Sequence, residues 1–462
     1  MLFNALEFPV FLILVLMGYR FLKTRNQRQY LLLGASLFFY GYWEWTYLLL
    51  LLATSGIDFF VALKIGKASS KSGRKLWLMV SLLSNLSILG YFKYAGFFVR
   101  SVLGLPQNEM PGFLNVLLPV GISFYTFQAM GYVLDVYRNR LPPESHFSRF
   151  LLFITFFPQL VAGPIERAPH LLGQLNALKG LPDTQRIFSG LALMAMGFVR
   201  KLCIADRLAP FTDTVFNTPE NFSLPVHILG LVFFGFQIYN DFAGYSDIAR
   251  GVARLFGIEL MENFRQPYLA SGLGDFWRRW HISLSGWFRD YVYQPLGAGS
   301  HGSVRTAINL LVVFGLSGFW HGANWTFLIW GAWHGTGLIL ERFLIPALKW
   351  RFVVRPWTWI WVFGGWFFFR ISDLSDISRF KQGVLTQPFR WTDFNLIGSW
   401  SELSLALISI PLLLVLENQW PTWKLKWEET AIRFKAVAIG SLAILILWIG
   451  TFKGQDFIYF QF

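Results

Sequence analysis

One histidine lies within an apolar stretch, where it could act as a base. His321 follows Trp320 and lies between the small residues Gly318 and Gly322. Burying a titratable side chain in hydrocarbon is costly, so we expect such a residue to have a function. A neutral imidazole can accept a proton near pH 7, and small neighbours leave room for a substrate. The alternative is a structural histidine that forms hydrogen bonds between packed helices.

Whether other polar residues lie on the same face as His321 depends on how far its helix continues. On one helix, Ser317 and Asn324 lie at i−4 and i+3, where they could fix the tautomer of the imidazole. His334 repeats the Trp-His-Gly triplet thirteen residues later. That separation is about 220° of rotation and about 20 Å of rise. We therefore expect His334 to be structural or to lie at the opposite mouth of a site, unless the helix breaks near Gly331.

A second unusual stretch, residues 274–291, alternates aromatic and ionic side chains. If it forms one helix, Trp277, His281 and Ser285 share a face and Arg278 lies beside them. This face could contribute to a polar site. The alternative is an amphipathic helix at a membrane interface, anchored by its tryptophans.

Two carboxylates, Asp241 and Asp247, close an apolar segment. Buried carboxylates need a cation or several hydrogen-bond donors. Judged by charge alone, Arg278, Arg279 and Arg289 are plausible partners. The favoured interpretation is a structural ion pair or an interface anchor.

The composition shows what must surround these residues. Of the 462 residues, 54% are hydrophobic and 14% are charged, whereas soluble proteins carry about 25% charged residues. So much apolar surface cannot be hidden in one water-soluble core. A soluble enzyme and a disordered chain are excluded, and the single cysteine, Cys203, excludes an intramolecular disulfide and a thiolate metal site. The sequence predicts an all-α polytopic integral membrane protein without a metal.

Apolar runs of about 20 residues predict about nine to eleven membrane-spanning helices. We expect them to form a single membrane domain over residues 1–462. Two weaker stretches, 150–161 and 188–199, are predicted to be re-entrant or interfacial, because Pro, Gly or Arg flank them. The clear candidates are residues 8–22, 31–52 (with a possible break at 43–45), 76–99, 113–136, 226–240, 307–331, 357–369, 403–416 and 436–452.

The formal net charge of +14 is carried by short loops between the apolar runs. This placement indicates anionic lipid headgroups and not nucleic acid as the partner. Arg20, Lys23, Arg25 and Arg28 follow the first apolar run. By the positive-inside rule, they place this loop in the cytoplasm and the N-terminus on the extracytoplasmic side.

Three long motifs resemble the membrane-bound O-acyltransferase (MBOAT) family. They are residues 241–247 (DFAGYSD), 275–285 (DFWRRWHISLS) and 318–327 (GFWHGANWTF). Residues 118–128 and 156–165 add to the resemblance. The likeness is strongest to the bacterial branch that contains the alginate O-acetylation membrane protein.

The resemblance implies an acyltransferase of the bacterial inner membrane, with helices around a central tunnel. It assigns the catalytic base to His321 and a second functional position to His281. The expected donor is cytoplasmic acetyl-CoA, with no bound cofactor, and the expected acceptor is a hydroxyl of an extracytoplasmic polysaccharide of the alginate type. A serine-hydrolase-like acetyltransferase is the expected protein partner.

Acyl transfer of this kind also needs hydrogen-bond donors for an oxyanion and a site for the donor. Asn324, Trp320 and His281 are candidate donors by position. Arg278 and Arg279 could attract the phosphates of CoA or anchor the chain at the membrane surface.

Three alternatives remain at this point. The acceptor could be peptidoglycan, or the acyl group could be D-alanine destined for teichoic acid. More distantly, the chain could be a proton-coupled secondary transporter in which His321 and Asp241 relay protons. Many transporters contain paired inverted repeats, whereas this sequence shows only the short Trp-His-Gly doublet.

Overall fold

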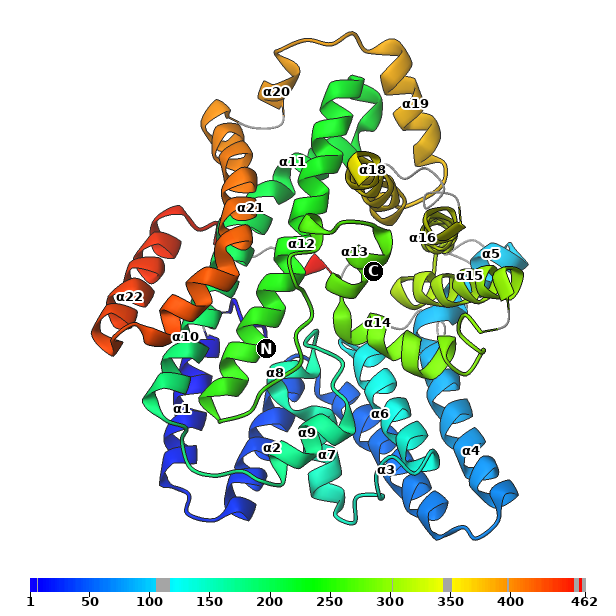
Figure 1. Cartoon of the computed structure of the whole chain (residues 1–462), viewed down its shortest axis with the longest axis vertical. Coiled ribbons are helices and arrows are strands. Elements are labelled where there is room, and N and C mark those ends of the chain that lie inside the picture. The colour runs from blue at the N-terminus through cyan, green and yellow to red at the C-terminus, as the bar shows by residue number, and fades with distance from the viewer. Residues whose placement is uncertain are drawn as a thin grey trace. The chain divides into compact units, whose positions relative to one another are not determined.

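A computed structural model describes residues 1–5, 7–104, 117–300, 302–343, 351–396, 399–452 and 457–458. All regular elements within these ranges are helices (Figure 1), which confirms the predicted all-α class. The chain divides into two compact units. Unit 1 comprises Met1–Met194 and Tyr245–Glu262, and unit 2 comprises Ala195–Gly244 and Asn263–Phe462. That the whole chain acts as one membrane domain remains a prediction.

Unit 1 consists of helices whose ends follow from local capping. Thr24 and Gln27 form a capping box at the start of α2. The Glu44 carboxylate accepts a hydrogen bond from the Thr46 backbone N–H at the start of α3, which confirms the predicted break at 43–45. The helices of this unit are α1 (Glu7–Phe21), α2 (Arg25–Gly41), α3 (Trp45–Lys67), α4 (Lys71–Leu89), α5 (Ala95–Leu103), α6 (Ile122–Tyr137), α7 (Phe147–Thr155), α8 (Phe157–Leu160) and α9 (Ala168–Leu175).

Unit 2 carries both histidine motifs. Within it, α16 packs against α15 and α18, as Figure 1 shows. Two helices pass from one unit into the other along the sequence, α10 (Thr184–Phe198) and α12 (Leu224–Leu255). The other helices of unit 2 are α11 (Asp206–Asn217), α13 (Leu273–Arg279), α14 (Ile282–Phe288), α15 (Gly302–His321), α16 (Trp325–Phe343), α18 (Arg351–Arg370), α19 (Asp376–Thr386), α20 (Asp393–Leu396), α21 (Trp400–Glu429) and α22 (Ile432–Ile449).

Among the described residues, seven helices are long and apolar enough to cross a membrane, fewer than the nine to eleven predicted. Part of the difference is length, because α1 and α6 have only 15 and 16 residues. The first residues of the predicted span 113–136 lie outside the described ranges. The seven candidates are Trp45–Lys67, Lys71–Ser101, Thr184–Asn217, Leu224–Leu255, Gly302–His321, Trp400–Gln419 and Ile432–Ile449.

The two weak stretches behave differently. Residues 150–161 fall in α7 and α8, which have nine and four residues and are too short to span, as predicted. Residues 188–199 are not a short separate element, because they belong to a continuous 34-residue helical stretch, Thr184–Asn217, that is long and apolar enough to cross a membrane. A π-helical turn, Val199–Ala205, carries the helix past Arg200 and Lys201, where the charges suggested an end.

The predicted span 307–331 is two helices instead of one. Helix α15 ends at His321, and α16 begins at Trp325. Asn324 Oδ1 accepts a hydrogen bond from the Thr326 backbone N–H (3.2 Å), so Asn324 caps α16. The break therefore lies at 322–324 and not near Gly331. Gly331 instead lets the helices touch, since a Cβ there would lie 2.3 Å from the Phe314 carbonyl oxygen.

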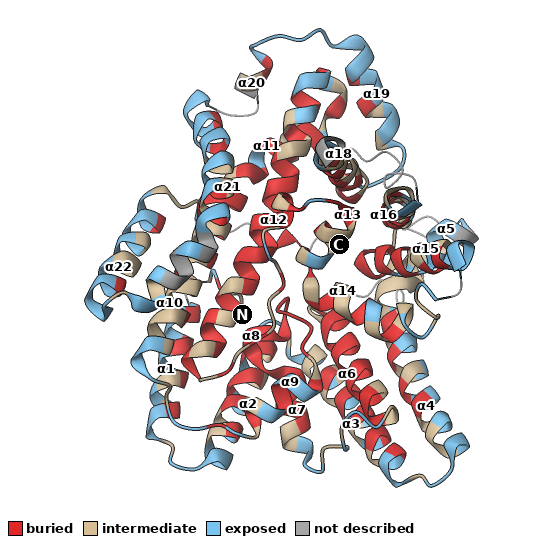
Figure 2. Cartoon of the chain, viewed as in Figure 1, coloured by how far each residue is buried: buried red, intermediate tan, exposed pale blue. Residues whose placement is uncertain are grey.

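Burial differs strongly between long helices. In the 18-residue apolar segment of α12, 72% is buried, whereas in that of α22 the share is 11% (Figure 2). Large apolar side chains of α22 are exposed, among them Ile444, Leu447 and Trp448. A helix that is apolar on its exposed side suits contact with lipid, whereas α12 is a core element.

Candidate active site

His321 is the last residue of α15 and is enclosed by aromatic rings. Only 5% of the residue is exposed. The ring centroids of Trp320 and Trp330 lie 5.0 Å from that of His321, and the centroid of Phe369 lies 5.3 Å away. These walls come from α15, α16 and α18, so the break at 322–324 is what allows α16 to fold back and present Trp330. Trp320, a candidate oxyanion donor by position, thus packs against His321.

His281 lies beside His321, with 6.4 Å between their ring centroids. It also contacts Phe242 at 4.7 Å and Trp320 at 6.0 Å. The structure thus brings together two histidines that are forty residues apart in the sequence. Both belong to unit 2.

Residues 274–291 do not form the single helix that a shared face of Trp277, His281 and Ser285 would require. Helix α13 ends at Arg279, α14 begins at Ile282, and His281 between them has a left-handed backbone with φ of 43°. Trp277, His281 and Ser285 therefore do not share a helix face. A left-handed conformation is unfavourable for a residue with a Cβ, and such strain persists only where the surroundings enforce it.

A neighbouring segment enforces this conformation. The Ile282 backbone N–H donates to the Asn263 carbonyl at 2.9 Å, and the Arg265 backbone N–H donates to the Arg279 carbonyl at 2.9 Å. The Ser283 hydroxyl donates to Asn263 Oδ1 at 2.6 Å. These bonds hold both sides of the break, so the imidazole of His281 is fixed by the backbone around it.

The buried surroundings keep His281 neutral. His281 is 1% exposed, and burial lowers the pKa of its imidazole to about 3. A neutral imidazole has one N–H donor and one acceptor nitrogen. Near pH 7 His281 can therefore exchange hydrogen bonds with a polar group but does not bring a full charge.

His334 contacts the same Trp330 ring as His321. Its ring is 4.9 Å from Trp330 and 5.0 Å from Trp277, and the residue is fully buried. The break at 322–324 folds the chain back, so the two histidines are one indole apart and not 20 Å apart. Gly365 packs against His334, because a Cβ there would lie 2.3 Å from Nε2. That His334 is structural or lies at the opposite mouth of a site stays a prediction.

The predicted role of Asn324 beside His321 does not agree with the structure. Its Nδ2 donates to the Ser372 carbonyl at 2.6 Å, and its Oδ1 caps α16. Both ends of the amide are thus engaged in holding the turn after His321. Ser317 is buried on α15, one helical turn before His321, as predicted.

The predicted arginine partners of Asp241 were wrong. Asp241 Oδ1 pairs with Lys201 Nζ at 2.7 Å, and Lys201 also pairs with Asp206 at 2.8 Å. Arg278 and Arg279 instead pair with Asp275, and the Arg278 side chain is 72% exposed. Sequence reasoning missed Lys201, although a lysine inside a continuous apolar stretch was a usable signal for a buried ion pair.

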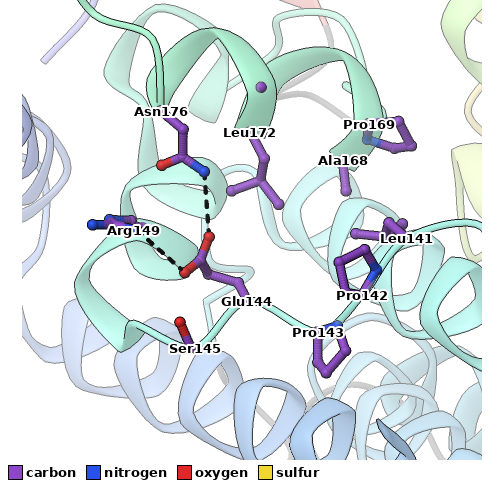
Figure 3. A pocket seen from close by; sticks show the side chains of 11 residues that line it. Leu141, Pro142, Pro143, Glu144, Ser145, Arg149, Ala168, Pro169, Leu172 and Asn176 are labelled. Carbon is purple, nitrogen blue, oxygen red and sulfur yellow. Dashed lines mark hydrogen bonds and ion pairs between the residues drawn. The ribbon is translucent and has the colours of Figure 1, made fainter.

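A separate pocket of about 380 Å³ lies in unit 1 (Figure 3). Glu144 is at its centre, with Arg149 at 3.9 Å and Asn176 at 3.4 Å from its carboxylate. None of the predicted site residues lines this pocket. Among the described residues there is also no group of three or more His, Cys, Asp or Glu side chains placed to hold a metal ion.

Known proteins are similar to this chain over half to four fifths of its length. The chain is 39% identical over 383 residues to a probable alginate O-acetylase of Azotobacter vinelandii, which covers 81% of this chain and 76% of the relative. It is 36% identical over 382 residues to a peptidoglycan O-acetyltransferase of Helicobacter pylori (76% and 72%). It is 31% identical over 252 residues to a teichoic acid D-alanyltransferase of Streptococcus thermophilus (51% and 58%).

A family comparison covers the region that contains the two histidines. A model of the membrane-bound O-acyltransferase family matches residues 37–372, a range that contains His281, His321 and the helices around them. With its long apolar helices, the chain is a multi-pass membrane protein. It belongs to the membrane-bound O-acyltransferase family.

Proposed function

We propose that this acyltransferase moves an acetyl group from cytoplasmic acetyl-CoA to hydroxyl groups of an exported polysaccharide of the alginate type. The observation that carries the proposal is the pair of buried, ring-walled histidines with centroids 6.4 Å apart. The similarity to probable alginate O-acetylases over about four fifths of the chain supports the acceptor class. Membership of the family favours acyl transfer over proton-coupled transport.

His321 is the general base in this proposal. A neutral nitrogen of its imidazole takes the proton of the acceptor hydroxyl as that oxygen attacks the thioester carbonyl carbon. A new C–O bond forms, and the carbonyl electrons move to an oxyanion. When the C–S bond breaks, the sulfur leaves as a thiolate and receives the proton from His321. Acceptor ester and free thiol are the products, and His321 is neutral again.

His281 and Trp320 are the proposed donors to the oxyanion. Both are buried beside His321, and each has a ring N–H to donate. Donors that are already positioned before the reaction stabilise developing charge more strongly in a dry site than in water. The rings of Trp330 and Phe369 exclude water, which also limits hydrolysis of the thioester.

The orientation of the loops decides on which side of the membrane the donor binds and the acyl group leaves. With the N-terminus outside and the chain in a bacterial inner membrane, Arg278 and Arg279 would attract the phosphates of CoA or anchor the surface. The acyl group would leave on the extracytoplasmic side, with a serine-hydrolase-like acetyltransferase as partner. The donor is a substrate, and the proposal needs no bound cofactor.

The experiment measures acetyl esters on the exported polysaccharide of cells that carry the intact protein, a deletion or His321→Ala. His146→Ala is the matched control, because His146 is exposed in unit 1. Protein in the membrane is quantified by blot. We expect esters to vanish in the deletion and in His321→Ala at normal protein levels, and to be unchanged in the control.

Other outcomes would change specific parts of the proposal. If His321→Ala keeps the esters that the deletion loses, His321 is not the base. If the deletion leaves polysaccharide esters intact, the proposed acceptor is wrong. Peptidoglycan O-acetyl groups and teichoic acid D-alanyl groups are then measured in the same strains, since relatives carry these names.

A further inference from the structure

Two residues near the C-terminus lie in the interior of unit 2. The Ile458 backbone N–H donates to Asp241 Oδ2 at 2.6 Å, and the Phe457 ring lies 5.7 Å from the ring of Phe242. Phe457 and Ile458 are 3% and 4% exposed. We call these two residues the C-terminal clasp.

The clasp is held by a buried group of charges. Lys201 lies between two carboxylates, 2.7 Å from Asp241 Oδ1 and 2.8 Å from Asp206 Oδ1. Asp241 therefore uses one oxygen for the lysine and the other for the Ile458 N–H. A hydrogen bond to an ionised buried carboxylate is stronger than one between neutral groups, and losing it leaves the carboxylate less well satisfied.

A second hydrogen bond ties the same region of the chain to the turn that carries Lys201. After α22 ends, the Thr451 backbone N–H donates to the Leu202 carbonyl at 2.9 Å. Leu202 follows Lys201 in the π-helical turn Val199–Ala205. Such turns leave carbonyl groups available for other partners and often occur at functional sites. One turn thus supplies both the carbonyl that accepts from Thr451 and Lys201, the ion-pair partner of Asp241.

The clasp reaches the candidate active site through one ring. Phe242 follows Asp241 in α12 and contacts His281, with 4.7 Å between centroids and perpendicular planes. The same ring contacts Phe457 and, at 5.0 Å, Phe264. Phe242 is fully buried. Displacing Phe457 would free space against Phe242, and the ring that packs on His281 would lose one of its supports.

We propose that Phe457 and Ile458 are positioning residues that hold Phe242 against His281, with Asp241 as their anchor. The inference rests on the proposed function, because it assumes that the place of His281 beside His321 matters for acyl transfer. It gives Asp241 a defined task, which is to hold the clasp and not to relay protons.

Ile458→Pro is the primary test, because proline has no backbone N–H to donate. Acetyl-ester formation is measured in membrane vesicles from the producing cells, supplied with acetyl-CoA. We expect kcat to fall about tenfold with little change in KM for acetyl-CoA. The conservative variant Ile458→Val keeps the N–H and is expected to restore the rate. Phe452→Ala is the matched control for the segment, because Phe452 is exposed.

Double variants test the proposed connections. Asp241→Ala combined with Ile458→Pro should be no slower than the more impaired single variant, since both break the same bond. Phe457→Ala in a His281→Asn background should likewise cause no further loss. Fully additive losses in both pairs would overturn the inference, as would a normal kcat in Ile458→Pro.

If Ile458→Pro does not accumulate, Phe457→Ala decides the question, because it keeps both backbone hydrogen bonds. A normal kcat for Phe457→Ala would then overturn the inference. Failure of the proposed function is distinguishable: a wrong donor or acceptor leaves wild-type vesicles without ester formation, and a wrong base leaves His321→Ala vesicles active, whatever the clasp variants do.

Discussion

His281 and His170 show two ways in which this chain surrounds a histidine. In unit 2, His281 is enclosed by Phe242, Trp320 and His321, and burial lowers its pKa to about 3. In unit 1, His170 Nδ1 lies 2.7 Å from Glu166, a buried carboxylate, and this hydrogen bond raises the pKa of His170. Aromatic walls thus favour the neutral imidazole, and a carboxylate favours the charged one.

The difference explains why a base of the proposed kind needs rings around it. A histidine that already carries a proton cannot take one from a hydroxyl. His321 has the same type of surroundings as His281, with Trp320, Trp330 and Phe369 around it. Among the described carboxylates of unit 2, Asp206 and Asp241 pair with Lys201, and Glu417 pairs with Arg200. In the proposed mechanism, the aromatic walls keep the imidazole of His321 neutral and able to accept a proton.

Lys201→Met is expected to have the largest effect, because it removes the cation from a buried ion group. It leaves Asp206 and Asp241 buried without their cation, which we expect to lower the free energy of unfolding by about 3–5 kcal/mol. The measurement is thermal unfolding of the purified protein in detergent. Lys67→Met, at an exposed position, is the control and should unfold like the wild type. Equal stability of the two variants would show that the ion group contributes little.

His281→Asn, which removes the imidazole from its aromatic surroundings, is expected to have the next largest effect. Asparagine tolerates the left-handed backbone but has no imidazole. We expect acetyl-ester formation per amount of protein to fall about 100-fold, with normal abundance in the membrane.

The comparison variant is His281→Val, which is β-branched and unsuited to positive φ. It should lose abundance as well as activity. If His281→Asn were as active as the wild type, the imidazole would have no role, and only the shape of the break would matter.

Gly365→Ala would disturb the rings without adding a charge. The new methyl group would lie 2.3 Å from His334 Nε2, between side chains that have little room to move. We expect a loss of about 1–3 kcal/mol in unfolding free energy. Gly440→Ala in α22 is the control, because nothing lies within 4 Å of its Cβ. That change should be neutral or stabilising by up to about 1 kcal/mol.

His170→Gln should have the smallest effect, and it should depend on pH. Because the folded-state pKa of His170 is raised, its pairing with Glu166 stabilises fully below the ordinary histidine pKa of about 6.5. The contribution is lost as the pH rises through the raised value. We therefore expect the melting temperatures of variant and wild type to differ more at pH 5.5 than at pH 8.5. A difference that grows toward pH 8.5 would reverse the assigned sign.

Local composition was sufficient to predict the fold class and to single out His321, whereas the functional position of His281 was implied by the family resemblance. A histidine among Trp and Gly in an apolar run, as at 318–322, stands out because hydrocarbon disfavours it. The position of the helix breaks was harder to predict. Residues 307–331 are mostly apolar and 25 residues long, which favours one span, whereas the turn at 322–324 depends on a contact between Asn324 and Ser372, 48 residues away.

The partners in ion pairs were also hard to predict from the sequence. Asp241 was predicted to need a cation, but several arginines were available by charge, and the choice of Lys201 depends on how two helices pack. The left-handed backbone of His281 depends on Asn263 and Arg265, which precede it by 18 and 16 residues. The pairing of Ile458 with Asp241 joins residues 217 apart. Such contacts follow from tertiary packing and leave no periodic pattern in the sequence.

The glycine contact between α15 and α16 bears on how the size of the transferred group could be altered. A Cβ at Gly318 would lie 2.2 Å from the Phe327 carbonyl oxygen, and one at Gly331 would lie 2.3 Å from that of Phe314. The two backbones therefore touch and form one stiff hairpin that carries His321. Extra volume for a longer acyl chain cannot be made on that side. Phe369, a removable ring on the separate helix α18, is the wall that an engineer would shorten first.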